Sequence, residues 1–504
     1  MISRLLIKLH RVLGTILSIL FLMWFLSGMV MMYHTYARVQ DSQKLEFAEK
    51  ADGNALPMEV LLDMSSLPID SVASVVMRKT AGNNTLAFRY ADGTERLVNA
   101  ENGETINSYY ADDLRQIANR WHTGGTSLKD TLNAIDIWLV GVYPVKEWPV
   151  YHYTFAGDDK AELYLSSRTG EALQYTTASS RFWSWIGAIP HWIYIKQLRA
   201  TGRQPWTDVV LWLSGIGAIM CLLGLVVGIR SLVLAYRSKK KKLTPYVKPL
   251  YKWHHVLGMV FGLFALTWVF SGYMSLQRVP EWMVKVHEKH NAQDDVKGSS
   301  VLSLADYSYD YRKVAEQQEV KRLTWTAFNG HPIYKVENAA GVGLIDAITG
   351  QPYVIDEEKC QTLAQKLAGE NQTADVEKLD EYDNYYINLS GKLSLPVWRL
   401  TIDDKDGSTY YINPVNGDVR YYNHNTRLRK WLYGGLHSFS GKFFLHHPVL
   451  RVVLMWLLLL GGAALSATGV FLGIRRCWKL YKSRAQVIGL QAENHKDAGS
   501  KPMS

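Results

Sequence analysis

The sequence has few cysteines and lacks the short motifs that mark common cofactor sites. Its three cysteines, Cys221, Cys360 and Cys477, fall in a membrane segment and on two opposite sides of the membrane in the topology argued below. That topology excludes a disulfide between any two of them in one chain. The sequence has no Cys-x-x-Cys-His motif for covalently attached haem, no Walker motif and no Gly-x-Gly-x-x-Gly fingerprint. The chain therefore has no recognisable nucleotide- or dinucleotide-binding segment.

Charge is almost absent from four long apolar runs, 12–32, 209–229, 256–276 and 449–474. Each run holds roughly 20 residues or more, which is enough for a helix to cross a hydrocarbon core of about 30 Å. We therefore expect four transmembrane helices in contact with the lipid bilayer. No carboxylate lies in these runs, which argues against a transporter of divalent cations, because such a site needs oxygen ligands.

The formal net charge of +10 is distributed unevenly along the chain. Basic residues precede the first run, follow the fourth, and fill the segment between the second and third, where no acid occurs from 231 to 252. By the positive-inside rule, both termini and this middle loop are cytosolic, and 36–205 and 279–447 lie on the other side. Nucleic-acid binding by the lysines at 239–242 is the less favoured interpretation. The first run lacks a small-residue cleavage site after a short apolar core, so we expect it to remain as an anchor.

The chain contains an internal repeat of about 245 residues. The heptapeptide KLHRVLG at 8–14 recurs as KWHHVLG at 252–258, and LGLVVGIR at 223–230 resembles TGVFLGIR at 468–475. Three further correspondences follow the first heptapeptide at the same offset of 244: Trp24 with Trp268, Ser27 with Ser271, and Gly28 with Gly272. Both halves follow the same path through the membrane, so they are parallel repeats related by a pseudo-twofold axis along the membrane normal.

Each exported region carries two apolar segments that run into a polar turn with glycine. The four turns are VNAENGETI, LSSRTGEAL, IDAITGQPY and INPVNGDVR, with their glycines at Gly103, Gly170, Gly350 and Gly417. Alternating apolar residues around such a turn predict β-hairpins. Segments such as 357–367 are predicted to be helices, so each exported region is expected to be a small α+β domain.

Two pairs of histidines obey the repeat. His10 and His254 precede the first and third apolar runs on the cytosolic side, and His191 and His437 end matching aromatic segments on the exported side. A pseudo-twofold axis would place the members of each pair opposite one another. Two imidazoles above and below a porphyrin give a six-coordinate iron suited to electron transfer, so these four residues are the predicted metal and cofactor ligands. The structural alternative is that each histidine faces lipid headgroups or forms hydrogen bonds within the bundle.

Two other histidines are reserve ligands. His255 is adjacent to His254, but the repeat places Arg11, which is not a histidine, at the matching position. His34 lies 24 residues after His10, about 36 Å along a helix, and so belongs to the opposite membrane face. The remaining exported histidines are expected at the surface, and they are His122, His152, His287, His290, His331 and His424.

The motifs together resemble those of the PepSY-associated transmembrane family of bacterial inner-membrane proteins. They are LHRVLG with WFLSGMVMMY, GAIPHWIYIKQLR, KWHHVLG with TWVFSGYMS, LHSF before the last run, and turns such as YYINPVNGDV. The family is often described as iron-regulated and includes ferric-siderophore reductases. The resemblance implies a four-helix bundle with two b-type haems and two periplasmic PepSY-like domains, and its histidine motifs match His10, His191, His254 and His437. The additional His34 departs from the simplest family pattern.

The predicted function is that of a transmembrane haem-dependent reductase, which passes electrons from an external donor to a periplasmic ferric chelate such as a ferric siderophore. The alternative is a cofactor-free regulator that binds peptides or peptidases through its PepSY-like domains. The expected organisation is transmembrane helices at 1–35, 206–230, 253–278 and 448–475, periplasmic domains at 36–205 and 279–447, a basic cytosolic loop at 231–252, and a cytosolic tail at 476–504.

Overall fold

A computed structural model describes residues 2–142, 147–200, 202–238, 243–370, 372–389, 391 and 393–498. In that part of the chain, four helices are long and apolar enough to cross a membrane. They are α1 (Ile2–Met31), α8 (Arg203–Tyr236), α9 (Pro249–Leu276) and α16 (Pro448–Ala498). These helices identify the chain as a membrane protein. The lysines at 239–242, on which the orientation argument partly depends, lie outside the described residues.

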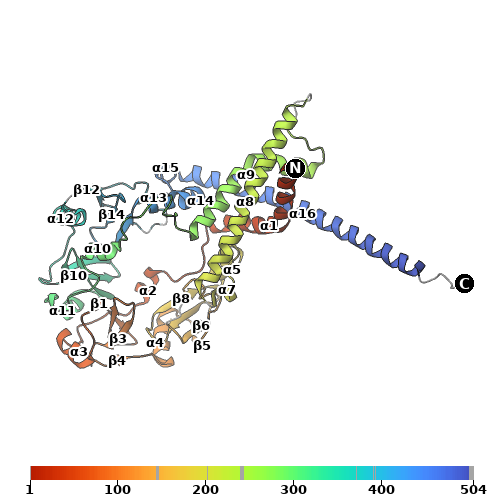
Figure 1. The fold of residues 1–504 in the computed structure, drawn as a ribbon. Coiled ribbons are helices and arrows are strands. Elements are labelled where there is room, and N and C mark those ends of the chain that lie inside the picture. Colours follow the sequence, from red (N-terminus) through yellow and green to blue (C-terminus); the bar gives the residue numbers. More distant parts are fainter. Residues whose placement is uncertain are drawn as a thin grey trace.

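The four long helices form one bundle, in which α1 packs against α16 and α8, and α9 packs against α8 and α16. The buried centre of the bundle includes Leu17, Phe21, Phe25, Trp268 and Leu458. Three of the helices extend beyond the predicted transmembrane ranges 206–230, 253–278 and 448–475: α8 continues to Tyr236, α9 begins at Pro249, and α16 continues through most of the expected tail. The later part of α16 projects away from the bundle (Figure 1).

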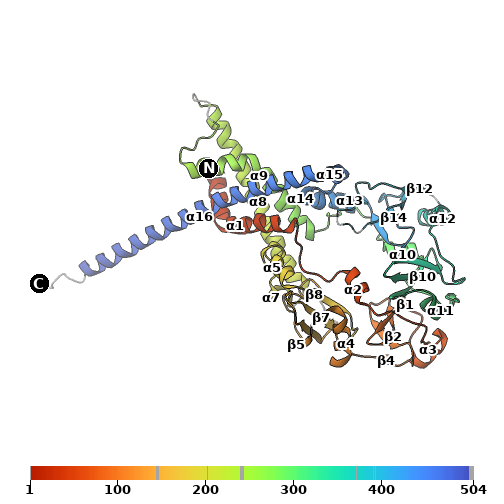
Figure 2. The same cartoon turned by 180° about the vertical axis from the view of Figure 1, so that it is seen from behind.

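The β-sheets lie together at one end of the bundle, and the start of α1 and the end of α8 lie at the other (Figure 2). The segment between α1 and α8 forms α2 (Asp41–Phe47), α3 (Met58–Ser65), β1 (Val72–Thr80), β2 (Asn83–Tyr90), β3 (Glu95–Asn99), β4 (Thr105–Ile106), α4 (Ala111–Trp121), β5 (Thr126–Leu132), β6 (Val150–Phe155), β7 (Glu162–Ser166), β8 (Ala172–Thr176), α5 (Ala178–Ile186), α6 (Ala188–Trp192) and α7 (Lys196–Ala200).

The segment between α9 and α16 forms α10 (Ala292–Lys297), η1 (Leu304–Asp306), α11 (Tyr311–Gln317), β9 (Arg322–Phe328), β10 (His331–Asn338), β11 (Gly341–Asp346), α12 (Glu357–Ala368), β12 (Ala374–Leu379), β13 (Val397–Ile402), β14 (Thr409–Ile412), β15 (Val419–Tyr422), α13 (His424–Lys430), the π-helical turn η2 (Trp431–Gly435), α14 (Leu436–Ser438) and α15 (Lys442–His446). The predicted helix at 357–367 is confirmed as α12, whose first turn is capped by the Asp356 side chain.

The two regions share a sheet, which the sequence did not predict. One seven-stranded sheet has the order β11-β10-β9-β1-β2-β3-β4, and the central β1–β9 pair is antiparallel, with Val76 opposite Thr324. Two four-stranded sheets, β5–β8 and β12–β15, complete the α+β part. Pairing β1 with β9 covers an edge that each strand would otherwise expose to solvent.

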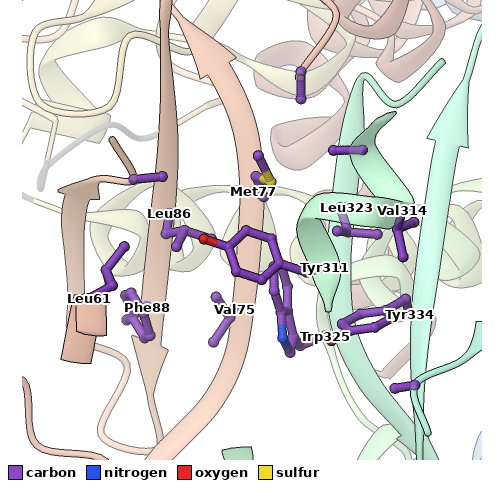
Figure 3. Close-up of a cluster of buried hydrophobic side chains, with 14 of the residues drawn as sticks. Leu61, Val75, Met77, Leu86, Phe88, Tyr311, Val314, Leu323, Trp325 and Tyr334 are labelled. Carbon is purple, nitrogen blue, oxygen red and sulfur yellow. The ribbon is translucent and has the colours of Figure 1, made fainter. Parts of the chain in front are cut away.

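Side chains from both regions fill one core beneath this shared sheet. Figure 3 shows Val75, Met77 and Phe88 from the first region beside Trp325 and Tyr334 from the second. Each of these five side chains is almost fully buried. Burial of large apolar side chains stabilises a fold by about 2 kcal/mol each, so the core holds the two regions together as one body.

The predicted turn glycines are confirmed in their conformation. Gly103, Gly170, Gly350 and Gly417 all have positive φ, at 74°, 69°, 75° and 68°. Gly103 joins β3 to β4, Gly170 joins β7 to β8, and Gly417 joins β14 to β15, whereas Gly350 precedes an isolated bridge between Ile345 and Pro352. Only glycine adopts such a backbone at little cost.

The expectation that His152 lies at the surface is wrong, because its side chain is 4% exposed. Its Nε2 lies 2.9 Å from Oε2 of Glu162, and Arg181 and Lys129 each lie 3.6 Å from the same carboxylate. Burial by itself would raise the pKa of Glu162, but the hydrogen bond from His152 and the neighbouring positive charges outweigh it and lower that pKa to about 2. β6 is buried on both faces, since Val150 on the same face as His152 and Tyr153 on the opposite face are also fully buried, and this explains the burial of His152.

Because folding lowers the pKa of Glu162, its contribution to stability is present above the ordinary carboxyl pKa and is lost as the pH falls towards 2. We expect Glu162→Gln to lower the free energy of unfolding of the sheet region by about 2 kcal/mol at pH 7, and by much less near pH 3. Hydrogen exchange of β7 amides in the full-length protein measures the difference. Exposed Glu370→Gln is the control, and an equal loss at both pH values would contradict this account.

Candidate functional site: two opposed histidine pairs

The helix bundle brings four histidines together as two pairs. His10 of α1 faces His254 of α9, with 6.4 Å between ring centroids, and His191 of α6 faces His437 of α14, with 6.1 Å between ring centroids. We call His191 and His437 the sheet-side pair, since α6 and α14 lie between the bundle and the sheets, and His10 and His254 the far pair. The structure therefore groups these four predicted site residues in the two combinations expected from the repeat.

The sheet-side pair is held by short helices that dock against the long ones. α6 packs on α1, and α14 packs on α9. Before α14 the chain makes the π-helical turn Trp431–Gly435, and such turns often occur at functional sites because they change the direction of the next side chains. After each short helix, the residue at Ile193 or Phe439 adopts a left-handed conformation with φ of 51°. Both α6 and α14 therefore end one residue after their histidine.

Nδ1 of each sheet-side histidine is bound to a serine of a long helix. In one case, Nδ1 of His191 lies 3.1 Å from Ser27 Oγ and 3.2 Å from the carbonyl oxygen of Trp24. In the other, Nδ1 of His437 lies 2.9 Å from Ser271 Oγ. Both serine hydroxyls donate to carbonyls of their own helices, so each accepts its second bond, and Nδ1 is the donor.

The far pair follows the same pattern with other partners. Nδ1 of His10 lies 3.1 Å from the carbonyl oxygen of Met220, which can only accept. Nδ1 of His254 lies 2.9 Å from Oγ1 of Thr468, and this hydroxyl donates to the carbonyl of Leu465. All four imidazoles therefore carry their proton on Nδ1. None of the four Nε2 atoms has a hydrogen-bond partner among the described residues, which leaves a lone pair on each.

This arrangement suits a metal ligand. A ligating histidine usually donates its second ring nitrogen to a hydroxyl or carbonyl, which fixes the tautomer and the ring orientation. Two imidazoles that share one metal ion, with bonds of about 2 Å, have ring centroids roughly 6 Å apart, close to the separations of both pairs. In the described part of the chain, no group of three or more His, Cys, Asp or Glu side chains could hold a metal ion by itself. A porphyrin supplies four nitrogen ligands, and two imidazoles would complete a six-coordinate iron.

A cavity of about 500 Å³ borders the sheet-side pair. Its lining includes both histidines, and most of the other lining residues are aromatic or aliphatic, among them Trp24, Phe25 and Trp268. Apolar cavities of several hundred Å³ with a few convergent polar groups are typical of cofactor sites. The residues at the sheet-side pair thus fit a flat apolar group that carries a metal ion.

The reserve ligands His34 and His255 belong to neither pair. The ring of His34 stacks on Trp183, with 4.1 Å between centroids and 8° between planes. His255 uses Nε2, the atom that is free in the four paired histidines, in a contact of 3.1 Å with the carbonyl oxygen of Gly228. Its ring lies edge-on to Tyr246. His254 therefore holds the position opposite His10, and His255 points to another helix.

Small residues leave room for the imidazoles. A Cβ atom added at Gly224 would lie 2.7 Å from Cε1 of His10, and one added at Gly28 would lie 3.5 Å from Cε1 of His191. These glycines recur in the internal repeat, but their closeness to the rings, like the hydroxyl partners, could not be derived from the sequence. The repeated Ser27 and Ser271 were the available signal, since a polar residue at membrane depth needs a partner.

Gly224→Ala should displace His10 and reduce binding of a metal cofactor at the far pair, because the new Cβ would overlap the imidazole. If each pair holds one b-type haem, as proposed below, the purified variant should lose about half of its haem absorbance per chain. Gly215→Ala, in the same helix, is the control, since its Cβ would lie 3.7 Å from Tyr273, an ordinary contact. Full absorbance in the Gly224→Ala protein would contradict the assignment of His10.

No model of a known protein family matches this chain, and no curated protein matches it. The function of the chain is therefore inferred from its own residues, above all from the two histidine pairs.

Proposed function

We propose that this chain is a bacterial inner-membrane electron-transfer protein that holds two b-type haems, one at each histidine pair, and reduces a ferric chelate such as a ferric siderophore in the periplasm. One observation carries the proposal. In each of two separate pairs, the imidazole centroids lie at about the distance that a shared metal ion requires. In all four rings Nδ1 donates a hydrogen bond and Nε2 is left with a free lone pair. Haem in such a site supplies a reversible one-electron change at iron.

The protein residues hold and orient the ligands. Ser27 and Ser271 accept from the sheet-side pair, while Thr468 and the Met220 carbonyl accept from the far pair. These bonds keep the proton on Nδ1 and present the Nε2 lone pair. Because the surroundings are apolar, a free Nδ1–H would cost on the order of 2 kcal/mol, so the rotated or alternative tautomeric state is disfavoured.

Equivalent contacts in the two halves support a parallel repeat. Ser27 and Ser271 stand 244 residues apart and bind histidines that stand 246 apart. In such an arrangement each half supplies one copy of the same serine–histidine contact, and the two histidines of the pair lie on opposite sides of the axis. The proposed periplasmic location of the sheets follows from the basic residues near the N-terminus and after 475, at the opposite end of the bundle.

Packed aromatic side chains occupy the bundle between the two pairs. The ring of Phe21 lies 5.8 Å from that of Trp24, and Phe25 lies 5.7 Å from Trp268. Phe21, Phe25 and Trp268 are all at least nine-tenths buried. These rings also line the cavity beside the sheet-side pair, so the region between the two pairs is made of apolar side chains.

Reduction of a ferric chelate is the reaction that best fits an acceptor outside the membrane. Fe(II) has a lower charge and is softer than Fe(III), so hard oxygen ligands hold it less tightly. The chain carries no recognisable donor site for nicotinamide or flavin, and the electron donor is a separate molecule.

Alanine substitutions test the ligand assignment. Purified parent protein should contain about two b haems per chain by pyridine haemochrome, and each of His10→Ala, His254→Ala, His191→Ala and His437→Ala should lose about one. His34→Ala and His255→Ala are the controls and should keep both. Colourless, well-folded parent protein from haem-sufficient cells would overturn the proposal and favour the cofactor-free peptide-binding alternative.

Electron transfer to the acceptor can be followed directly. Protein reduced with dithionite, freed of excess reductant and mixed with a ferric hydroxamate, should be reoxidised, as seen by the return of the oxidised Soret band. The gallium chelate has the same shape and charge but cannot be reduced at this potential, so it should leave the spectrum unchanged. Reduced protein that remains stable with the ferric chelate would contradict the proposed acceptor.

A further inference from the structure

The two halves make the same backbone contact beside the sheet-side pair with different side chains. Nε1 of Trp206 donates to the carbonyl oxygen of Trp192 at 2.8 Å. Nε of Arg451 donates to the carbonyl oxygen of Ser438 at 2.9 Å. Arg451 stands 245 residues after Trp206, and Ser438 stands 246 after Trp192. An arginine therefore replaces an indole at the corresponding place, and each carbonyl follows directly after a histidine of the pair.

The replacement adds a positive charge to the cavity. Arg451 lines the cavity and is partly buried, and its bond to Ser438 uses only Nε, so the two terminal nitrogens remain for another acceptor. Arg451 has no ion pair with an acid in the described part of the chain. Arg451 lies in the first turn of α16, where the helix dipole already carries positive charge, so a cation there without an acid nearby is unfavourable, which favours an anionic occupant of the cavity.

A second arginine reaches the same cavity. Arg38 follows α1, lines the cavity, and has its guanidinium carbon 5.8 Å from the centroid of the Trp192 ring. It also lacks an ion pair with any acid among residues that the structure describes. No Asp or Glu occurs among the lining residues. Two cations without a compensating acid match a ligand with two negative groups.

We propose that Arg451 and Arg38 bind the two carboxylates of the ligand in this cavity, and that these are the propionates of the haem held by the sheet-side pair. Arginine suits this role because its guanidinium binds a carboxylate through two parallel hydrogen bonds. The inference rests on the proposed function, since it requires haem at His191 and His437. A carboxylate of the acceptor chelate is the other source of the same chemistry.

Arg451→Trp is the sharpest test, because it installs the residue that the other half already uses and can keep the bond to the Ser438 carbonyl. We expect haem to leave this variant for apomyoglobin roughly ten times faster than it leaves the parent, the factor for one charge-assisted hydrogen bond. The midpoint potential of one haem should also fall, because a nearby cation favours the less positive ferrous state. Arg38→Gln should change both quantities in the same direction. Arg203→Gln, an exposed arginine at the start of α8, is the control and should change neither.

Haem dimethyl ester has no free carboxylates, so it distinguishes binding of the haem propionates from binding of a carboxylate of the acceptor chelate. Parent protein reconstituted with the ester should lose it about as fast as Arg451→Trp loses haem, and the substitution should add little further effect. Unchanged haem release and potential in Arg451→Trp, with weaker binding of the chelate, would overturn the inference while the proposed function stands. A parent protein without haem would overturn both.

Discussion

The candidate site depends on one constraint: an imidazole buried among apolar helices must satisfy its N–H. Each of the four histidines meets this requirement with Nδ1, through a hydroxyl or a carbonyl of a long helix. In an apolar region water cannot replace such a partner, so the loss of one bond would leave a costly unpaired group. The same bond decides which nitrogen is free, and it thereby decides what the pair can bind. Orientation, tautomer and ligand capacity all follow from a single acceptor per ring.

The sheets stabilise the relative position of the two halves. β1 and β9 pair at the centre of one sheet, and Val75 and Trp325 pack in a core to which both regions contribute. If each region had its own closed sheet, only the helices would hold the halves together. In the chain, α6 and α14 follow the two four-stranded sheets, through α5 in the first half and through α13 and η2 in the second. Each sheet-side histidine is therefore held where a sheet region meets the bundle.

Much of the site could be predicted from the sequence because each histidine motif occurs once in each half of the repeat. His10 and His254, and likewise His191 and His437, stand at matching offsets, and the structure places each pair face to face. The partner atoms could not be predicted, since Thr468 and the Met220 carbonyl depend on how α16 and α8 are rotated in the bundle. The pairing of β1 with β9 was also not accessible, because alternation shows which residues of a strand are buried but not which strand lies beside it. His152 was misassigned for a similar reason, since its burial depends on Glu162 ten residues away.

The differences between the two halves are as informative about the candidate site as their similarities. At the far pair the ring of His10 fits closely against α8, as the small space at Gly224 indicates. At the sheet-side pair the equivalent of Trp206 is Arg451, and Arg38 adds a second positive charge beside the cavity. Positive charge favours the reduced state of an adjacent redox centre, by an amount that grows as the surroundings become less polar. In the proposed function, this positive charge would raise the potential of the sheet-side centre relative to that of the far centre, which favours electron transfer from the far pair towards the sheets.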